Sequence, residues 1–424
     1  MKKHLSLVKS ILILMLALIA LYQVSELWLV ALTNRNFFLY IEARFPAAVP
    51  DGQSAWILPY RLFFGTGCGR YRVRYSGIEN SHEWVFGSFA VSQILSGGVY
   101  AGEVSHHGLM DISGGRPLLV YEYSFPMHGE TFARALGGRR GGFPSGSPVT
   151  TFTSVTLLPP AGGMDEPLIC AFFWNGSVFS HFTLSLDTRR FDLYDFLFEA
   201  VEIEEGELYF TRSETGFSPV LPEGFAFAAV YVENPFHNAF GLLHLSTIRP
   251  RIEHFFDNPA TILPGPSRDV YTFSNINVMV RYLLFDVLEY TSFRPIGRTA
   301  PANLVSDFSA ALAFVQSDPY VINEIYLVGY EVRGGNHVFS FGYVLDNFPI
   351  VLDVARLTMP DCREPLASPI EVTVSHGRVV RYRRLAQTFH TSDRLVYFEG
   401  DVSGHSTLGF VFDESNEVHF SGIR

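Results

Sequence analysis

With 424 residues, the chain is long enough for two or three domains, since a domain averages about 100–200 residues. Its composition, 48% hydrophobic and 17% charged, excludes a disordered protein. The net charge of −11 argues against a general nucleic-acid-binding protein, which needs a basic surface. Lys2, Lys3 and Lys9 are the only lysines. The remainder therefore lacks the lysine of a phosphate-binding loop, a protein kinase or a Schiff-base enzyme.

An almost unbroken apolar stretch, residues 11–32, follows these lysines. A helix of about 22 residues spans roughly 33 Å, close to the thickness of a bilayer's hydrocarbon core. Because positive charge keeps the preceding end in the cytoplasm, we expect residues 1–34 to form a cytoplasmic tip and a single transmembrane anchor, with the bulk of the chain extracytoplasmic. A cleaved signal peptide is the alternative, but no A-x-A pattern follows the apolar run.

Four residues interrupt or close the outer half of this stretch: Gln23, Ser25, Glu26 and Trp28. One interpretation places them at the level of the outer lipid headgroups. The other lets them bind a neighbouring transmembrane helix through hydrogen bonds, which makes them candidate partner-binding residues.

Residues 35–205 are expected to form a first exported α+β domain. Residues 70–75 alternate polar with apolar side chains, as a half-buried strand does, and residues 117–125 predict another strand. A hairpin is predicted over residues 169–184, with Asn175-Gly176 forming a type I′ turn. A loop at 137–148 and a helix at 191–200 complete the region.

Residues 206–298 are expected to form a β-rich middle domain. A short helix is predicted from Arg251 to Phe256, closed by Asp257-Asn258-Pro259. A turn at Asn275 separates two of the expected strands. The strands cover residues 225–232, 270–273 and 278–290. Residues 295–301 are typical of a linker.

Residues 299–424 are expected to form a C-terminal α+β domain. Its helix starts near Pro301, repeats apolar side chains at helical spacing and ends at Asp318-Pro319. The spaced side chains are Leu304, Phe308, Leu312 and Val315. Strands are predicted over residues 325–332, 338–345, 370–374 and 379–383, with turns at 334–336 and 376–377. The predicted fold class is thus α+β: a single N-terminal transmembrane helix followed by mostly antiparallel sheet with a few packed helices.

No sequence pattern points to a catalytic or metal site. His106-His107 is the closest histidine pair, but neighbours on a strand point to opposite faces, so we expect a surface loop there. Residues 65–69 are glycine-rich without a helix start after them, and Gly404-His405-Ser406 has no helix after it either. The acidic group at 202–205 is expected to be solvated. We predict no cofactor, no metal and no catalytic residues.

The three cysteines lie far apart in the sequence and form no C-x-x-C pair, which excludes a zinc ribbon or a thioredoxin-type site. They are Cys68, Cys170 and Cys362. We expect all three to be buried thiols, and at most one disulfide can form among them.

One basic cluster stands out near the C-terminus: Arg378, Arg381, Arg383 and Arg384. On a strand, Arg381 and Arg383 share one face, while Arg378 and Arg384 share the other. One interpretation is a solvated strand edge that discourages aggregation. The other is a docking surface for an acidic partner or a wall polymer.

The order of segments in the last region carries a family resemblance. It runs NEIYLVGY (323–330), VFSFGYVLDNFPI (338–350), IEVTV (370–374) and RVVRYRR (378–384). Upstream lie FDNP (256–259), VYT (270–272) and LEY (288–290). This order resembles the YycH family and, more distantly, its companion YycI. Asn347-Phe348-Pro349 departs from the turn expected in that pattern.

The resemblance implies a regulator without catalytic residues. YycH-like proteins are single-pass membrane proteins that act with YycI on a sensor histidine kinase, WalK (YycG), which governs cell-wall metabolism. The implied partners are therefore a WalK/YycG-like sensor kinase, a YycI-like companion and the membrane, with no nucleic acid. Contacts are expected through the transmembrane helix and the exported domains.

Two alternatives stay open from the sequence. An exported cell-wall hydrolase, a glycosidase or an amidase, would need two carboxylates at hydrolase spacing or ligands converging on a metal. A passive wall- or ligand-binding module would need a deep pocket lined by aromatic side chains.

Overall fold

The structure, a computed structural model of the chain, describes most of residues 58–423. The described residues are 58–67, 69–75, 82–136, 142–159, 168–185, 207–213, 216–237, 243–265, 270–283, 286–294, 304–352, 366, 368–398, 400, 402, 405, 407–412 and 418–423. They form mostly antiparallel sheet with a few helices, which confirms the predicted α+β class. The anchor predicted at 11–32 lies outside them, and none of their helices is long and apolar enough to cross a membrane.

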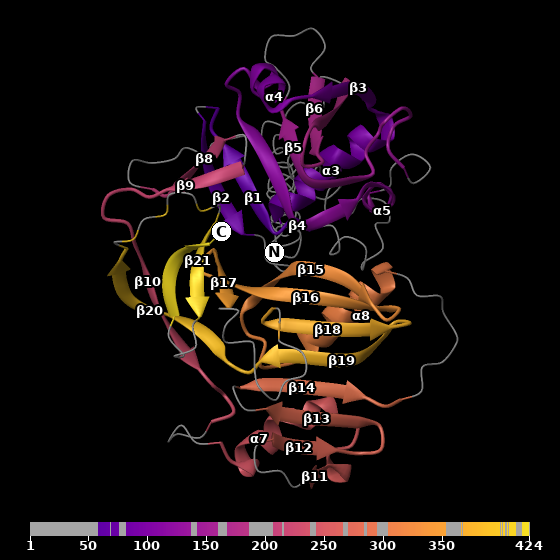
Figure 1. Cartoon of the computed structure of the whole chain (residues 1–424), viewed down its shortest axis with the longest axis vertical. Coiled ribbons are helices and arrows are strands. Elements are labelled where there is room, and N and C mark those ends of the chain that lie inside the picture. Colours follow the sequence, from indigo (N-terminus) through magenta and orange to yellow (C-terminus); the bar gives the residue numbers. More distant parts are fainter. Residues whose placement is uncertain are drawn as a thin grey trace, which may run out of the picture.

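A nine-stranded sheet builds what we call the N-terminal lobe (Figure 1). Its strand order is β3-β7-β6-β5-β4-β1-β2-β8-β9. The strands are β1 (Arg61–Gly65), β2 (Arg70–Tyr75), β3 (Val99–Val104), β4 (Leu118–His128), β5 (Thr151–Leu158), β6 (Leu168–Trp174), β7 (Phe179–Ser185), β8 (Tyr209–Ser213) and β9 (Gly216–Val220). The helices are α3 (His82–Gly97), α4 (His106–Ser113) and α5 (Gly129–Ala135).

Helices cover both faces of this sheet. Trp84 and Ile94 of α3 and Phe132 of α5 join the core on one face, and Leu109 of α4 packs with Phe172 on the other. Since both faces are covered, the central strands are buried almost throughout, whereas β2 keeps the alternation that its sequence predicts.

An eleven-stranded sheet builds the C-terminal lobe. Its order is β11-β12-β13-β14-β19-β18-β16-β17-β21-β22, with β15 paired to β16, and β17 and β21 form its parallel pair. The strands are β11 (Leu263–Gly265), β12 (Val270–Ser274), β13 (Val278–Leu283), β14 (Val287–Ser292), β15 (Glu324–Arg333), β16 (Asn336–Leu345), β17 (Phe348–Leu352), β18 (Ile370–Ser375), β19 (Arg378–Leu385), β21 (Thr407–Phe412) and β22 (Val418–Ile423).

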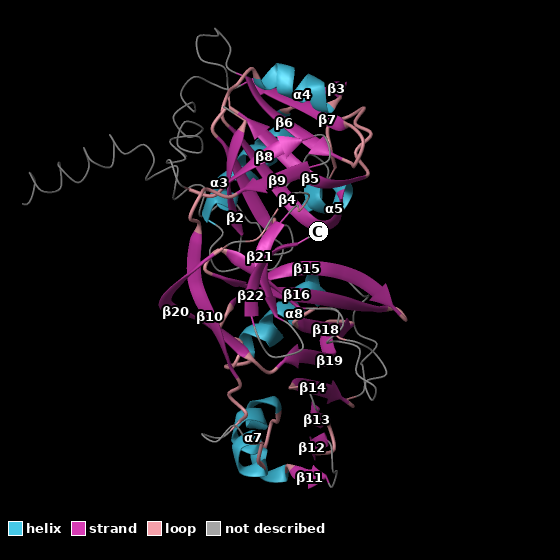
Figure 2. Cartoon of the chain, turned by 60° about the vertical axis from the view of Figure 1, so that its left-hand side comes forward, coloured by secondary structure: helices cyan, strands magenta, loops and turns pink. Residues whose placement is uncertain are grey.

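Helix α8 (Leu304–Ser317) packs on the middle of this sheet, on β16, β18 and β19. Phe308, Ala311 and Val315 form its buried side, so the predicted helix and its packing on one face of the sheet are confirmed. Helix α7 (Leu245–Ile252) continues into the 3₁₀ turn η4 (Glu253–Phe255) and lies beside the far end of the sheet, near β11–β13 (Figure 2). A further 3₁₀ turn, η5, covers Pro259–Thr261.

A two-stranded ribbon of β10 (Ala226–Glu233) and β20 (Thr388–Tyr397) runs along one side of the C-terminal lobe (Figure 1). Phe227 anchors it through ring contacts with Phe410 and Phe420. Three large apolar side chains of the ribbon are more than half exposed: Tyr231 (51%), Leu395 (61%) and Tyr397 (67%).

Turn residues fix several hairpins. Gly334 and Gly335 have positive φ angles of 60° and 82°, and His376 and Gly377 have 51° and 77°, so both predicted turns are confirmed. At Asn175-Gly176 the predicted hairpin forms, but the predicted turn type is wrong because only Gly176 has a positive φ. The Asn175 carboxamide oxygen instead accepts hydrogen bonds from three groups that follow it in the loop.

Three other expectations differ from the structure. The helix predicted at 251–256 begins earlier, at Leu245, and Pro250 lies inside it. The domain limits at 205/206 and 298/299 do not separate the sheets, because β8 and β9 complete the N-terminal sheet and β14 pairs with β19 across the second limit. The helix predicted at 191–200 lies outside the described residues.

Candidate functional site

The predicted arginine cluster lies on β19, a central strand between β14 and β18. Arg383 is 3% exposed and Arg384 is fully buried, so neither can contact a partner protein. The docking-surface hypothesis is therefore wrong for these two residues, and the solvated-edge interpretation is wrong for the strand as a whole. Arg378, at the start of β19, is exposed.

Arg381 and Arg383 share one face of β19, as their spacing predicts, and both face carboxylates of neighbouring strands. Arg381 Nε lies 2.8 Å from Glu289 on β14, and Arg383 Nη1 lies 3.1 Å from Glu371 on β18. Glu289, only 4% exposed, also pairs with Arg281 of β13. Each arginine of this row thus has a carboxylate partner on a neighbouring strand, with Glu289 shared between two of them.

Arg384 points to the opposite face and forms a fully buried ion pair with Asp318, at the end of α8. Its Nε donates to Asp318 Oδ2 at 2.7 Å, and the Tyr382 hydroxyl donates to the same oxygen at 3.0 Å. Burial is the largest single effect and opposes the charged form of Arg384, but Asp318, Tyr382 and Tyr343 together outweigh it and hold the pKa of Arg384 above its ordinary value. The guanidinium thus serves as a structural charge inside the lobe.

The four residues proposed for contacts inside the membrane, Gln23, Ser25, Glu26 and Trp28, lie outside the described residues. His106 and His107 lie within them and begin helix α4, so the loop predicted there is wrong. Ser105 caps this helix by accepting a hydrogen bond from Gly108 N. Cys170 is a buried free thiol, as predicted, and burial raises its pKa.

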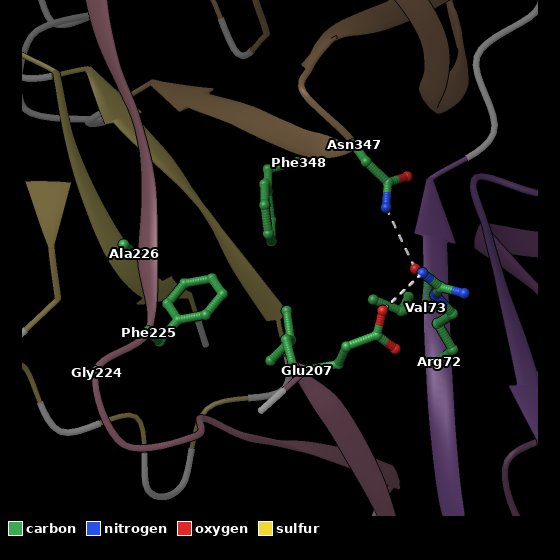
Figure 3. Close-up of a pocket in the computed structure, with 9 residues that line it drawn as sticks. Arg72, Val73, Glu207, Gly224, Phe225, Ala226, Asn347 and Phe348 are labelled. Carbon is green, nitrogen blue, oxygen red and sulfur yellow. Dashed lines mark hydrogen bonds and ion pairs between the residues drawn. The ribbon is translucent and has the colours of Figure 1, made fainter. Parts of the chain in front are cut away.

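A cavity of about 350 Å³ opens where the two lobes meet (Figure 3). Strand β2 and the two residues before β8 supply one wall, while the start of β17 with the turn before it and the start of β10 with the residues before it supply the other. The lining residues are Arg72, Val73, Glu207, Leu208, Gly224, Phe225, Ala226, Asn347 and Phe348. Because residues from both lobes line this cavity, we take it as the candidate functional site.

One side of the cavity is charged. Arg72 Nη2 donates to Glu207 Oε1 at 3.2 Å, and both side chains reach solvent, with exposures of 52% and 33%. In contrast to the buried arginines of β19, Arg72 keeps part of its guanidinium accessible. Within the described part of the chain, Glu207 supplies the one carboxylate of the cavity lining, whereas a glycosidase typically uses two.

Asn347 joins the two lobes through side-chain hydrogen bonds. It follows Asp346 in the tight turn between β16 and β17, and both residues have positive φ angles, of 64° and 50°. Its side chain accepts a hydrogen bond from Tyr75 N at 3.0 Å and donates to the Val73 carbonyl at 3.3 Å. The turn that departs from the YycH-like pattern is thus the one that joins the C-terminal lobe to β2.

Other buried contacts join the lobes beside the cavity. Arg61 of β1 pairs with Glu122 of β4 and donates to the Thr407 hydroxyl of β21. The rings of Tyr60 and Tyr326 stack with centroids 6.1 Å apart. The cavity is therefore set in a packed junction.

The alternating arginines of β2 are not among the site residues predicted from the sequence. Arg70, Arg72 and Arg74 lie on the exposed side of β2, whereas the alternating side chains between them are buried. The sequence RYRVRY carries this signal, because arginines at every second position of a strand share one face. What it could not reveal was that Glu207 and Asn347 would lie beside them.

Comparison of the chain with protein-family models, with curated proteins and with solved structures gives no match.

Proposed function

We propose that this chain is a membrane-anchored, extracytoplasmic regulator of a sensor histidine kinase of the WalK/YycG type. It acts by protein contact through its transmembrane helix and its exported lobes, together with a YycI-like companion. The observation that carries the proposal is the apolar stretch at 11–32 preceded by Lys2, Lys3 and Lys9, which tethers a large exported portion to the membrane.

The strand order supports the same proposal. The segments that resemble the YycH family form β15, β16, β17, β18 and β19 of a single sheet, with tight turns between β15 and β16, between β16 and β17, and between β18 and β19. Nearly the whole resemblance after the anchor therefore falls within one folded unit, as a shared domain requires.

The exposed ribbon is the surface we assign to contact with an exported partner. Tyr231, Leu395 and Tyr397 place apolar area on strands whose outer edges are unpaired within the described residues. Aromatic and aliphatic side chains exposed on a strand ribbon are typical of protein-binding surfaces. Tethering in one membrane raises the effective concentration of the partners, so weak contacts are sufficient.

The anchor is tested by replacement. An anchor of equal length and unrelated sequence, fused to residue 35, is expected to change the output of the kinase, read from a reporter gene under its response regulator. A narrower variant, Gln23→Leu with Ser25→Leu and Glu26→Leu, is expected to do the same, whereas Ile13→Leu on the inner half is the matched control. Unchanged kinase output with normal display of the protein contradicts control through the helix.

The ribbon is tested separately with the native anchor in place. Tyr231→Ser together with Tyr397→Ser is expected to weaken co-purification with the kinase and the companion, while Tyr100→Ser serves as a control at the far end of the N-terminal lobe. Equal recovery of partners by both proteins contradicts the assignment of the ribbon. That result would not bear on the role of the anchor, which the replacement experiment tests separately.

A further inference from the structure

The junction cavity has two walls of different chemistry (Figure 3). Arg72 and Glu207 face it from the N-terminal lobe side, with opposite charges 3.2 Å apart. Phe225 and Phe348 face it from the other side, as the close-up shows. A ligand that fits both walls must carry charge at one end and apolar surface at the other.

The apolar wall packs directly against the buried core, which holds its rings in place. Phe348 packs against Phe410 and Phe420, with ring centroids 5.9 and 4.9 Å apart, and Phe225 packs against Phe420 at 5.8 Å. Aromatic rings held in this way offer a preformed surface for an aromatic or aliphatic side chain. The adjoining loop has Gly224 with a φ of 74° and no atom within 4 Å of the place a Cβ would occupy, so it adds no bulk to the rim.

The polar wall is also fixed in place. Arg72 lies on β2, which is paired on both sides, by β1 and β8. Its Nη2 contacts Glu207, and this is its one ion pair within the described residues, so the other guanidinium N–H groups are available for a ligand carboxylate. Asn347, held by its two hydrogen bonds to β2, completes the polar side.

We propose that this cavity binds a free amino acid with an apolar side chain. The α-carboxylate pairs with Arg72, the α-ammonium pairs with Glu207, and the side chain packs on Phe225 and Phe348. An anion alone would meet the charge of Glu207, and a cation alone would meet that of Arg72, whereas a zwitterion matches both. The volume of about 350 Å³ lies at the small end of the range for ligand pockets, about 300–1,000 Å³.

Such a ligand contacts both lobes and therefore stabilises their junction. Ligand that binds the folded chain raises its unfolding temperature in proportion to the logarithm of its concentration above Kd. The inference does not depend on the proposed regulatory function, because the cavity lining includes neither the anchor nor the exposed ribbon residues Tyr231, Leu395 and Tyr397.

The first experiment uses the unmodified full-length chain in detergent micelles. Titration calorimetry with L-phenylalanine and with L-leucine is expected to show saturable binding. L-phenylalaninamide, which lacks the carboxylate, and N-acetyl-L-phenylalanine, which lacks the ammonium, are each expected to bind at least about tenfold more weakly. Absence of saturable binding of both amino acids, or equal affinity for phenylalanine and its two derivatives, overturns the proposal.

The second experiment locates the site. Arg72→Gln is expected to weaken binding of L-phenylalanine at least about tenfold. Arg70→Gln is the matched control, because Arg70 lies two positions away on the same face of β2, packs over the Tyr209 ring and is not part of the lining. Equal affinity of these two variants, each checked for the circular-dichroism spectrum of the unmodified chain, contradicts binding in this cavity. If Arg72→Gln does not fold, Phe348→Leu is the second variant, with a matching loss expected for phenylalanine.

Discussion

Asp318 concentrates buried polar contacts inside the C-terminal lobe. Its side chain is fully buried and accepts hydrogen bonds from Arg384 and Tyr382, while the Tyr320 backbone N–H donates to its other oxygen at 3.0 Å. A buried ion pair adds little net stability over well-packed apolar residues, but removal of one partner leaves the other charge unpaired. The ion pair as a whole therefore contributes little net stability, whereas the loss of one partner is strongly destabilising. A substitution at Asp318 measures this asymmetry.

Asp318→Asn is expected to lower the free energy of unfolding by about 3–5 kcal/mol, since it leaves Arg384 buried without a counter-charge. The matched control is Glu130→Gln, which breaks the exposed pair with Arg134, whose side chains are 75% and 69% exposed. That change is expected to stay within about 0.5 kcal/mol. Urea denaturation of the full-length chain, followed by circular dichroism, measures both, and equal midpoints would contradict the asymmetry.

Two histidines make stability depend on pH. Burial lowers the pKa of His181, which stacks on Phe172, below its ordinary value of 6.5. Burial also lowers the pKa of His254; nearby Asp318 partly offsets this effect and Arg384 adds to it. Below pH 6.5 the unfolded chain therefore binds more protons than the folded chain, so the stability present above pH 6.5 is lost as the pH falls through the lowered folded-state values.

We predict that the free energy of unfolding falls between about pH 7.5 and about pH 5.5, and that His181→Phe with His254→Gln reduces this slope. His376→Gln, at an exposed turn, is the control for the loss of a histidine side chain alone. Urea titrations at several pH values measure the slope. An unchanged slope in the double variant would assign the pH dependence to other groups.

At the scale of elements, local patterns predicted most strands and turns. The alternation of residues 70–75 and the apolar run of α8 each carry their structure in the immediate sequence, and the turns at 334–335 and 376–377 contain glycines that the positive φ angles require. Turn type at Asn175 failed because the side chain's own hydrogen bonds compete with the type I′ geometry.

The sequence alone could not predict which strands pair with one another in the sheets. The pattern of residues 378–384 shows which arginines share a face, but not that Glu289, 92 positions before Arg381, and Glu371 would pair with them. A strand with four arginines is indistinguishable from an exposed edge until its neighbours are known. The cavity could not be predicted from the sequence for the same reason, because its walls come from four separate parts of the chain.

The β18–β19 turn provides a prediction at this scale. Gly377 has a φ of 77°, and no atom lies within 4 Å of the place a Cβ would occupy, so Gly377→Ala is opposed by backbone conformation alone. A loss of about 1–2 kcal/mol in the free energy of unfolding is expected. Gly142→Ala is the control, because that site is equally open and lacks a positive φ. Equal urea midpoints for the two variants would contradict a conformational role for Gly377.

At the scale of the whole molecule, the two lobes are joined by contacts of several kinds. Asn347 bonds to β2, Arg61 donates to Thr407, and the Ser124 hydroxyl on β4 donates to the Leu327 carbonyl on β15 at 2.7 Å. The buried core also runs across the junction, because Tyr326 belongs to the same apolar cluster as residues of the N-terminal sheet. The lobes are therefore expected to unfold together.

Weakening this junction tests the coupling. The unmodified chain is expected to unfold in one calorimetric transition, and Asn347→Gly with Tyr326→Ala is expected to split it into two, because each lobe keeps its own sheet while the contacts that Asn347 and Tyr326 make between them are lost. Glycine at 347 retains the positive φ and removes only the side-chain hydrogen bonds. The control pair, Asn336→Gly with Tyr231→Ala, removes the same groups from the β16 hairpin and the exposed ribbon, and should leave one transition. A single transition in both pairs, with the same lowering of the unfolding temperature, would mean that the lobes are coupled by the remaining contacts rather than through Asn347 and Tyr326.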